Sequence, residues 1–184
     1  MFDFEQIKQK HSKIIRKAID YMDSMQDPEH DINHTNDVVE LACKIIERLP
    51  DEDIDYDCVI ICAYWHDVAR VYDSEGHELK SAQMLKEELL ATGYPQDFAE
   101  KCFVAIVNHK WDMMPQNIEG KIVKDADKVA FLGLGRWKSC LENNFRLDDI
   151  LEFLPRLRDE ILIFDVSRKL YDEQIASLVK FLHG

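Results

Sequence analysis

The sequence contains little glycine and proline and has a large excess of negative charge. Only 6 Gly and 5 Pro occur among 184 residues, which argues against a turn-rich β protein and favours helices with short connections. The formal net charge is -13, and Lys and Arg form no basic run. A nucleic-acid polymer is therefore an unfavourable partner, because binding a polyanion requires clustered cations.

Long apolar runs and a secretion signal are also missing. No apolar run approaches the roughly 18 residues that a membrane-spanning helix needs, and the first ten residues are amphipathic and charged. The five cysteines stand at positions 43, 58, 62, 102 and 140, and no Cys-x-x-Cys pair occurs. An odd number of thiols in apolar stretches indicates buried, reduced cysteines. We therefore expect a cytoplasmic protein with no membrane partner.

Apolar residues recur at helical spacing along most of the chain. The predicted helices cover approximately residues 4–25, 33–49, 57–70, 77–92, 96–110, 118–132 and 136–141, followed by a helical tail over 147–182. Pro155 is expected to break or kink that tail. No repeat or linker divides the chain, so we expect one all-α domain over residues 1–184.

The segment Asp57–Arg70 differs from the other predicted helices because residues 58–65 are almost continuously apolar. A helix that is apolar all round belongs in the centre of a bundle. His66 and Asp67 close this segment, and a buried carboxylate normally requires a partner that offsets its desolvation. A divalent metal is one such partner. The alternative is an aspartate near solvent at the helix end, beside a core histidine.

Two more predicted helices carry polar residues where a site could form. His34 opens the second helix, and Asp127 lies at the edge of the apolar stripe of the sixth. Asp125 points about 200° away from Asp127 on a regular helix, so the two cannot face one site. One of the two aspartates is therefore expected either to lie behind the residues that bind the metal directly or to face solvent.

Cys58, Cys62 and His66 recur every four residues and share one helix face. A mixed thiolate and imidazole metal site is one interpretation. Core packing of the two thiols is the preferred one, because no other cysteine is placed to complete a zinc tetrahedron.

The ordered set His34, His66-Asp67 and Asp127 resembles the motif of the HD superfamily of metal-dependent phosphohydrolases. Three longer stretches are similar to small bacterial members that cleave nucleotides, namely residues 30–35 (HDINHT), 77–82 (HELKSA) and 125–128 (DADK). The last has Lys128 where those members usually have Arg. The resemblance covers about residues 30–135, with a helical extension over 136–184, and implies an HD-domain bundle around a buried His-Asp helix.

The resemblance also implies a metal site. Its ligands would be His34, His66, Asp67 and Asp127, holding Mn²⁺ or Mg²⁺ in the first instance, with Fe, Co, Ni or Zn as alternatives. His77 and His109 match the places where two-metal members hold a second ion. Substrate contact or proton transfer, and an exposed helix-end histidine, are the other interpretations of these two residues.

The expected reaction is hydrolysis of a phosphate ester or pyrophosphate bond in a small anionic substrate, with a nucleotide implied by the resemblance. The expected catalytic residues are Asp67, Arg70 and His109, and the expected substrate-binding residues are Lys80, Lys110 and Lys128. Arg70 could equally be a solvated helix-end residue. A di-iron oxygenase and a catalytically silent sensing or docking module are the alternative functions. The sequence leaves the oligomeric state open.

Overall fold

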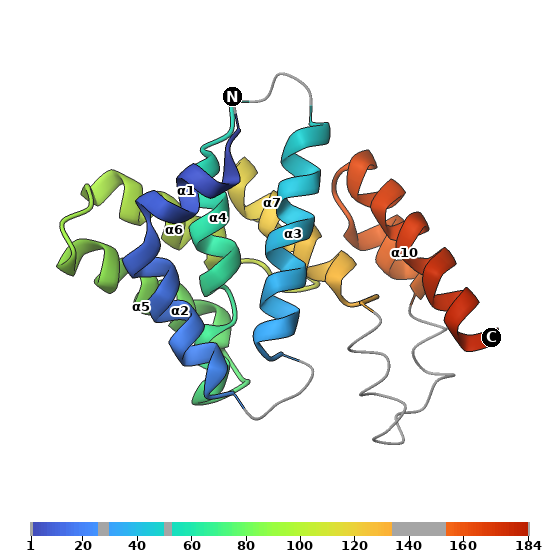
Figure 1. Ribbon diagram of the computed structural model, residues 1–184, viewed down its shortest axis with the longest axis horizontal. Helices are drawn as coiled ribbons and strands as arrows, with labels where there is room; N and C mark the ends of the chain where they lie inside the picture. The colour runs from blue at the N-terminus through green and yellow to red at the C-terminus, as the bar shows by residue number, and fades with distance from the viewer. Residues whose placement is uncertain (1, 26–29, 50–52, 134–153, 184) are drawn as a thin grey trace.

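The computed structural model shows a helical bundle and describes residues 2–25, 30–49, 53–133 and 154–183 (Figure 1). Its elements, in order, are α1 (Phe4–Lys10), α2 (Ser12–Asp23), α3 (Ile32–Arg48), α4 (Tyr56–Trp65), the 3-10 helix η1 (Val68–Val71), α5 (His77–Ala91), α6 (Gln96–Val107), α7 (Ile118–Ala130), the π-helical turn η2 (Leu157–Ile161) and α10 (Asp165–His183). The described residues contain no β-strand. The predicted all-α class is confirmed.

Helix α4 occupies the centre of the bundle, as its composition predicts. Residues 58–65 are all buried, and α4 packs against α1, α2, α3, α5, α6 and α7. Figure 1 shows α4 between α3 and the pair α5 and α6. The Asp55 carboxylate caps the helix by accepting the N–H of Cys58 at 3.1 Å. Burial on every side follows from a segment that has no polar face.

The predicted first helix over residues 4–25 is two helices that meet at His11. The buried His11 ring has its Nδ1 2.7 Å from the hydroxyl of Tyr94 and its Nε2 3.2 Å from the carboxylate of Asp57. Both partners lie on other segments of the chain. The break is therefore associated with a tertiary contact. The local sequence contains no helix-breaking residue that would have predicted it.

Residues 154–156 are helical, and the tail breaks at residues 162–164. The predicted break or kink at Pro155 borders residues that lie outside the described part of the chain, and it stays a prediction. The N–H groups of Ile163 and Phe164 donate to the Asp125 carboxylate, at 3.0 and 2.9 Å. These two N–H groups are thus satisfied by a side chain of α7 instead of by helix carbonyls. The predicted short helix over 136–141 lies outside the described residues.

Helix α5 begins and ends beside glycines with positive φ. Gly76 precedes the helix with φ 70°, and Gly93 follows its C-cap with φ 87°. Side chains disfavour this left-handed conformation, so glycine sets both ends. Helix α6 stops at Val107, three residues before the predicted end. Among the described residues, no helix is both long enough and apolar enough to cross a membrane.

Candidate metal centre

Six buried side chains from five segments converge at one end of α4. They are His34, His66, Asp67, His77, His109 and Asp127. The ring centroids are 5.6 Å apart for His34 and His66, and 5.4 Å apart for both His66–His109 and His77–His109. The structure thus brings together all four side chains expected to bind one metal and both side chains expected near a second.

A sharp turn lets His66 and Asp67 face the same region. Neighbouring side chains on a regular helix diverge by about 100°. Here α4 ends at Trp65, Asp67 has φ -108° and ψ 4°, and the 3-10 helix η1 starts at Val68. The α-helix therefore terminates at the His-Asp pair, as two adjacent inward-facing side chains require.

The two oxygens of the Asp67 carboxylate face different imidazoles. Oδ2 lies 3.6 Å from Nε2 of His66 and 3.9 Å from Nε2 of His34. Oδ1 lies 3.0 Å from Nε2 of His77 and 3.6 Å from Nε2 of His109. One oxygen of Asp67 therefore faces His66 and His34, and the other faces His77 and His109.

These donors form two groups that could each hold an ion. One consists of His34, His66 and Asp127, and the other of Asp67, His77 and His109, with the ligand atoms of each group within 4.8 Å of one another. In the first group, Oδ1 of Asp127 lies 3.3 Å from Nε2 of His34. Each group could therefore hold an ion, and Asp67 has one oxygen facing each group.

Three of the histidines are oriented in the same way by the backbone. Nδ1 of His66, His77 and His109 lies 2.7–2.8 Å from the carbonyl oxygen of the residue three positions earlier. A carbonyl can only accept, so Nδ1 donates and the neutral ring presents a lone pair at Nε2. Metal-binding histidines are commonly oriented by this type of hydrogen bond.

The charge state of the centre suits a cation. Burial lowers the pKa of His66 to about 4, so its ring is neutral at pH 7. Burial alone would raise the pKa of Asp67, but the surrounding groups, His66 first, hold that pKa well below its usual range. Buried Nε2 atoms of His34, His66 and His77 have no hydrogen-bond partner. A nitrogen lone pair and an ionised carboxylate repel each other when they face one another. A divalent ion bound between them would attract both, because imidazole nitrogen and carboxylate oxygen are common metal ligands.

Asp127 is held ionised in the same way, with a different main partner. Burial would raise its pKa, but the charge of Lys128, followed by the effect of the nearby His34 ring, keeps the pKa well below its usual range. The Lys128 ammonium is buried and also lies 4.4 Å from the ring centroid of Trp111. Lys128 therefore links the metal centre to the wall of the adjacent cavity.

A cavity of about 240 Å³ adjoins the centre and is rich in cations. Its lining residues are Arg70, Ser74, His77, Glu78, His109, Lys110, Trp111, Asp112 and Lys128. Nε of Arg70 lies 2.9 Å from Oδ2 of Asp67. Lys80 does not reach this cavity, because it is exposed and its ammonium lies 4.4 Å from the ring centroid of Tyr72. Two of the three predicted substrate-binding lysines, Lys110 and Lys128, thus line the cavity together with Arg70.

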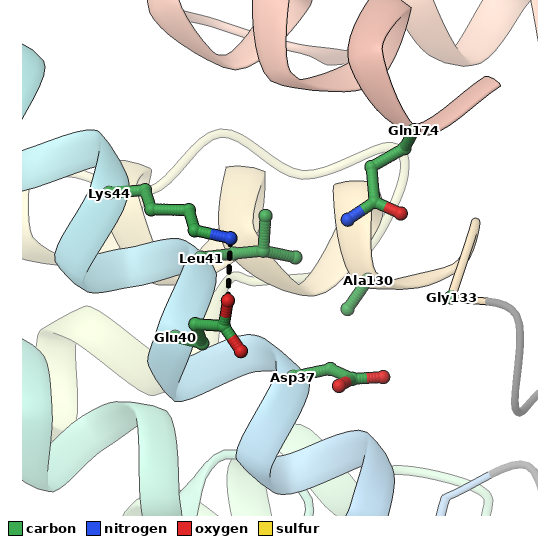
Figure 2. Close-up of a pocket in the computed structure, with 7 residues that line it drawn as sticks. All are labelled: Asp37, Glu40, Leu41, Lys44, Ala130, Gly133 and Gln174. Carbon is green, nitrogen blue, oxygen red and sulfur yellow. Dashed lines mark hydrogen bonds and ion pairs between the residues drawn. The ribbon is translucent and has the colours of Figure 1, made fainter. Parts of the chain in front are cut away.

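A second pocket lies between α3, α7 and α10 and differs in chemistry (Figure 2). It has a volume of about 320 Å³ and is lined by Asp37, Glu40, Leu41, Lys44, Ala130, Gly133 and Gln174. Its one lysine is already paired, since Lys44 donates to Glu40 at 2.6 Å. None of its lining residues is a histidine. The smaller cavity is therefore the candidate substrate site.

Two side chains near the cavity that adjoins the metal centre are not among the residues predicted from the sequence. The buried Glu78 carboxylate lies 3.6 Å from Nε2 of His77 and 3.4 Å from Nζ of Lys110. The buried Lys124 ammonium donates to the backbone carbonyls of Trp111, at 3.2 Å, and Met113. Glu78 could have been found from the sequence, because it directly follows the expected ligand His77. Lys124 could not, because its hydrogen-bond partners lie in a loop and no local pattern indicates them.

Asp125, which was not expected to face the same site as Asp127, contacts a different part of the chain. It is fully buried and accepts backbone N–H groups from Ile163 and Phe164. Burial raises its pKa, in contrast to Asp67 and Asp127. Asp125 is therefore not solvent-facing, and it fastens the segment before α10 to α7.

Comparison with known proteins gives the family. The model of the HD domain matches residues 31–132. A predicted HD superfamily hydrolase from an uncultured Thermotogales bacterium has a TM-score of 0.76 at 23% identity, covering 99% of this chain and 96% of that chain. Bacillus subtilis YpgQ, solved in complex with ADP, has a TM-score of 0.69 at 22% identity, with coverages of 96% and 93%. A search of curated proteins gave no match. Because the HD domain match spans more than half of the sequence, the chain belongs to the HD domain family.

Proposed function

We propose that the chain is a metal-dependent phosphohydrolase that acts on a small phosphorylated substrate, a nucleotide in the first instance. The observation that carries the proposal is the set of backbone-oriented Nε2 lone pairs facing ionised carboxylates beside a cation-lined cavity. Membership of the HD family supports hydrolysis. The ADP complex of YpgQ, a protein of the same fold, supports a nucleotide.

The ligands proposed for one ion are His34, His66, Asp67 and Asp127. His77 and His109, with the second oxygen of Asp67, are proposed for a second ion. A divalent ion, Mn²⁺ or Mg²⁺ in the first instance, would supply Lewis acidity toward a phosphate oxygen and lower the pKa of water. The hydrogen bonds at Nδ1 would keep the imidazoles turned toward the ion.

The cations of the cavity would bind and orient the phosphate chain. Arg70 can form paired hydrogen bonds to phosphate oxygens, whereas Lys110 and Lys128 act as point charges. Arg70 also pairs with Asp67, so it would position the carboxylate while it binds substrate. Where only one ion binds, Nε2 of His109 would be a proton acceptor for water in the cavity.

The two groups of ligands also favour one competing function, a di-iron oxygenase. Each group combines imidazole and carboxylate donors, which suit iron as well as manganese. The two functions differ in what they consume, since only the oxygenase requires O₂ and two irons.

A substrate screen tests the proposal. Purified protein is assayed with nucleoside mono-, di- and triphosphates in the presence of Mn²⁺, Mg²⁺, Co²⁺ or Fe²⁺, and released phosphate and pyrophosphate are measured. We expect hydrolysis that requires the metal, is lost in Asp127→Ala and persists in Asp73→Ala, which changes an exposed aspartate near η1. Two bound irons, O₂ consumption and no phosphate release with any nucleotide would contradict the proposal.

A further inference from the structure

Three cysteines form a second buried cluster near the other end of α4. Cys58 and Cys62 lie one turn apart on α4, Cys102 lies on α6, and all three are fully buried. Cys58 precedes His66 by eight residues, which is about 12 Å along a helix axis. The sequence predicted core packing of the first two thiols, and the packing of α6 against α4 adds the third.

The spacing of the sulfurs matches that of a three-coordinate metal site. The Sγ atoms of Cys58 and Cys62 are 3.9 Å apart, those of Cys58 and Cys102 are 3.6 Å apart, and all three lie within 4.8 Å of one another. Metal–sulfur bonds of about 2.3 Å in a trigonal plane place sulfurs about 4.0 Å apart. An ion could therefore bind with small adjustments of the side chains.

The chemistry of the cluster favours a soft ion. The pKa of Cys58 and of Cys62 is raised well above its usual range. Burial would also raise the pKa of Cys102, but hydrogen bonds with these two thiols lower it. Cys102 is therefore the first of the three to become a thiolate, and binding of an ion would displace the other two protons. Thiolates select soft ions such as Cu(I). A structural zinc site requires four ligands, whereas this cluster has three among the residues that the structure describes.

We propose that Cys58, Cys62 and Cys102 form a three-coordinate site for a soft, thiophilic ion of the Cu(I) type, distinct from the candidate metal centre. Its occupation would cross-link α4 to α6, the helices that end just before His66 and His109. The proposal is independent of the proposed hydrolysis, because its ligands are sulfur atoms that lie outside the six-residue centre.

The test is an anaerobic Cu(I) titration of the Cys43→Ser/Cys140→Ser protein, in which the cluster supplies all remaining cysteines. Cu(I) is delivered from a coloured chelator, and chelator competition and thiolate-to-Cu(I) ultraviolet absorption are recorded. We expect one Cu(I) per chain, with affinity falling at least about 100-fold when Cys102 becomes Ala or Ser. His34→Ala should bind Cu(I) as the parent protein does.

Circular dichroism shows which variants are folded, and Cys102→Ser keeps the side-chain volume if Cys102→Ala does not fold. Equal Cu(I) affinity in a folded Cys102 variant would overturn the proposal. So would loss of Cu(I) binding in His34→Ala, a parent protein that binds no Cu(I), or a Cys58–Cys102 disulfide in protein purified without oxidant.

Discussion

The two ends of α4 are equally buried but present different donors. Near the start of the helix, Cys58 and Cys62 meet Cys102, and the three sulfurs contact one another. After its last residue, His66 and Asp67 meet imidazoles and carboxylates, and several Nε2 atoms there lack a hydrogen-bond partner. A cation-lined cavity adjoins this second group. Burial alone thus does not distinguish the two ends, whereas the unpaired donors and the adjacent cavity do.

The largest expected effect is at Asp67, and it tests whether the His-Asp end carries the chemistry. Asp67→Asn and Asp67→Ala remove the charge that faces both groups of imidazoles. Because a catalytic metal supplies several kcal/mol of charge stabilisation, we expect nucleotide hydrolysis to fall at least about 1000-fold, or about 4 kcal/mol. The measurement is turnover at saturating Mn²⁺, with circular dichroism as the control for folding.

Asp73→Ala, which changes an exposed residue close in sequence, should keep wild-type turnover. Near-normal turnover in folded Asp67→Ala would remove the distinction between the two ends of α4.

The next effect is the pH dependence of stability caused by His66. Its pKa is about 4 in the folded protein and about 6.5 when unfolded. Between these values the unfolded chain binds a proton that the folded chain does not, so stability rises with pH from about 4 to 6.5 and is lost on acidification. The shift corresponds to about 3 kcal/mol.

Denaturant unfolding of metal-free protein between pH 4 and 7 measures this contribution. We expect His66→Gln, which does not titrate in this range, to show a shallower pH dependence than the wild type. An unchanged slope would show that the buried ring does not control acid stability.

A smaller effect is expected at Asp125, the buried carboxylate that lies outside the metal centre. Asp125→Ala leaves the N–H groups of Ile163 and Phe164 without their acceptor. Loss of hydrogen bonds to a charged group costs about 2 kcal/mol, so the free energy of unfolding should fall by that amount. Metal content per folded chain should stay as in the wild type, and a loss of bound metal would place Asp125 in the centre after all.

The smallest of these effects is expected at Arg70. Arg70→Ala should lower kcat/KM about 10-fold, or about 1.4 kcal/mol, because the paired contacts to phosphate and Asp67 are lost. Lys80→Ala is the matched control outside the cavity and should change kcat/KM less than about threefold, as substitutions at open surfaces do. A larger loss of kcat/KM in Lys80→Ala than in Arg70→Ala would show that the substrate does not bind in this cavity.

Much of the fold could be predicted because helical periodicity is a local property. The apolar run at residues 58–65 predicted the central position of α4, although the helix expected over residues 57–70 ends at Trp65. The break at His11 and the break at residues 162–164 could not be predicted. Each coincides with hydrogen bonds to residues distant in the sequence, Tyr94 in one case and Asp125 in the other.

The sequence by itself determined the helical class, the central helix and the order of the residues that converge on its end. Only the tertiary structure decided how those residues are used. The packing of α5 and α6 turned one oxygen of Asp67 toward His77 and His109, and it brought Cys102 to the two thiols of α4. Helix periodicity is encoded within a few turns, whereas the partner of a buried polar atom depends on which distant segment packs against it.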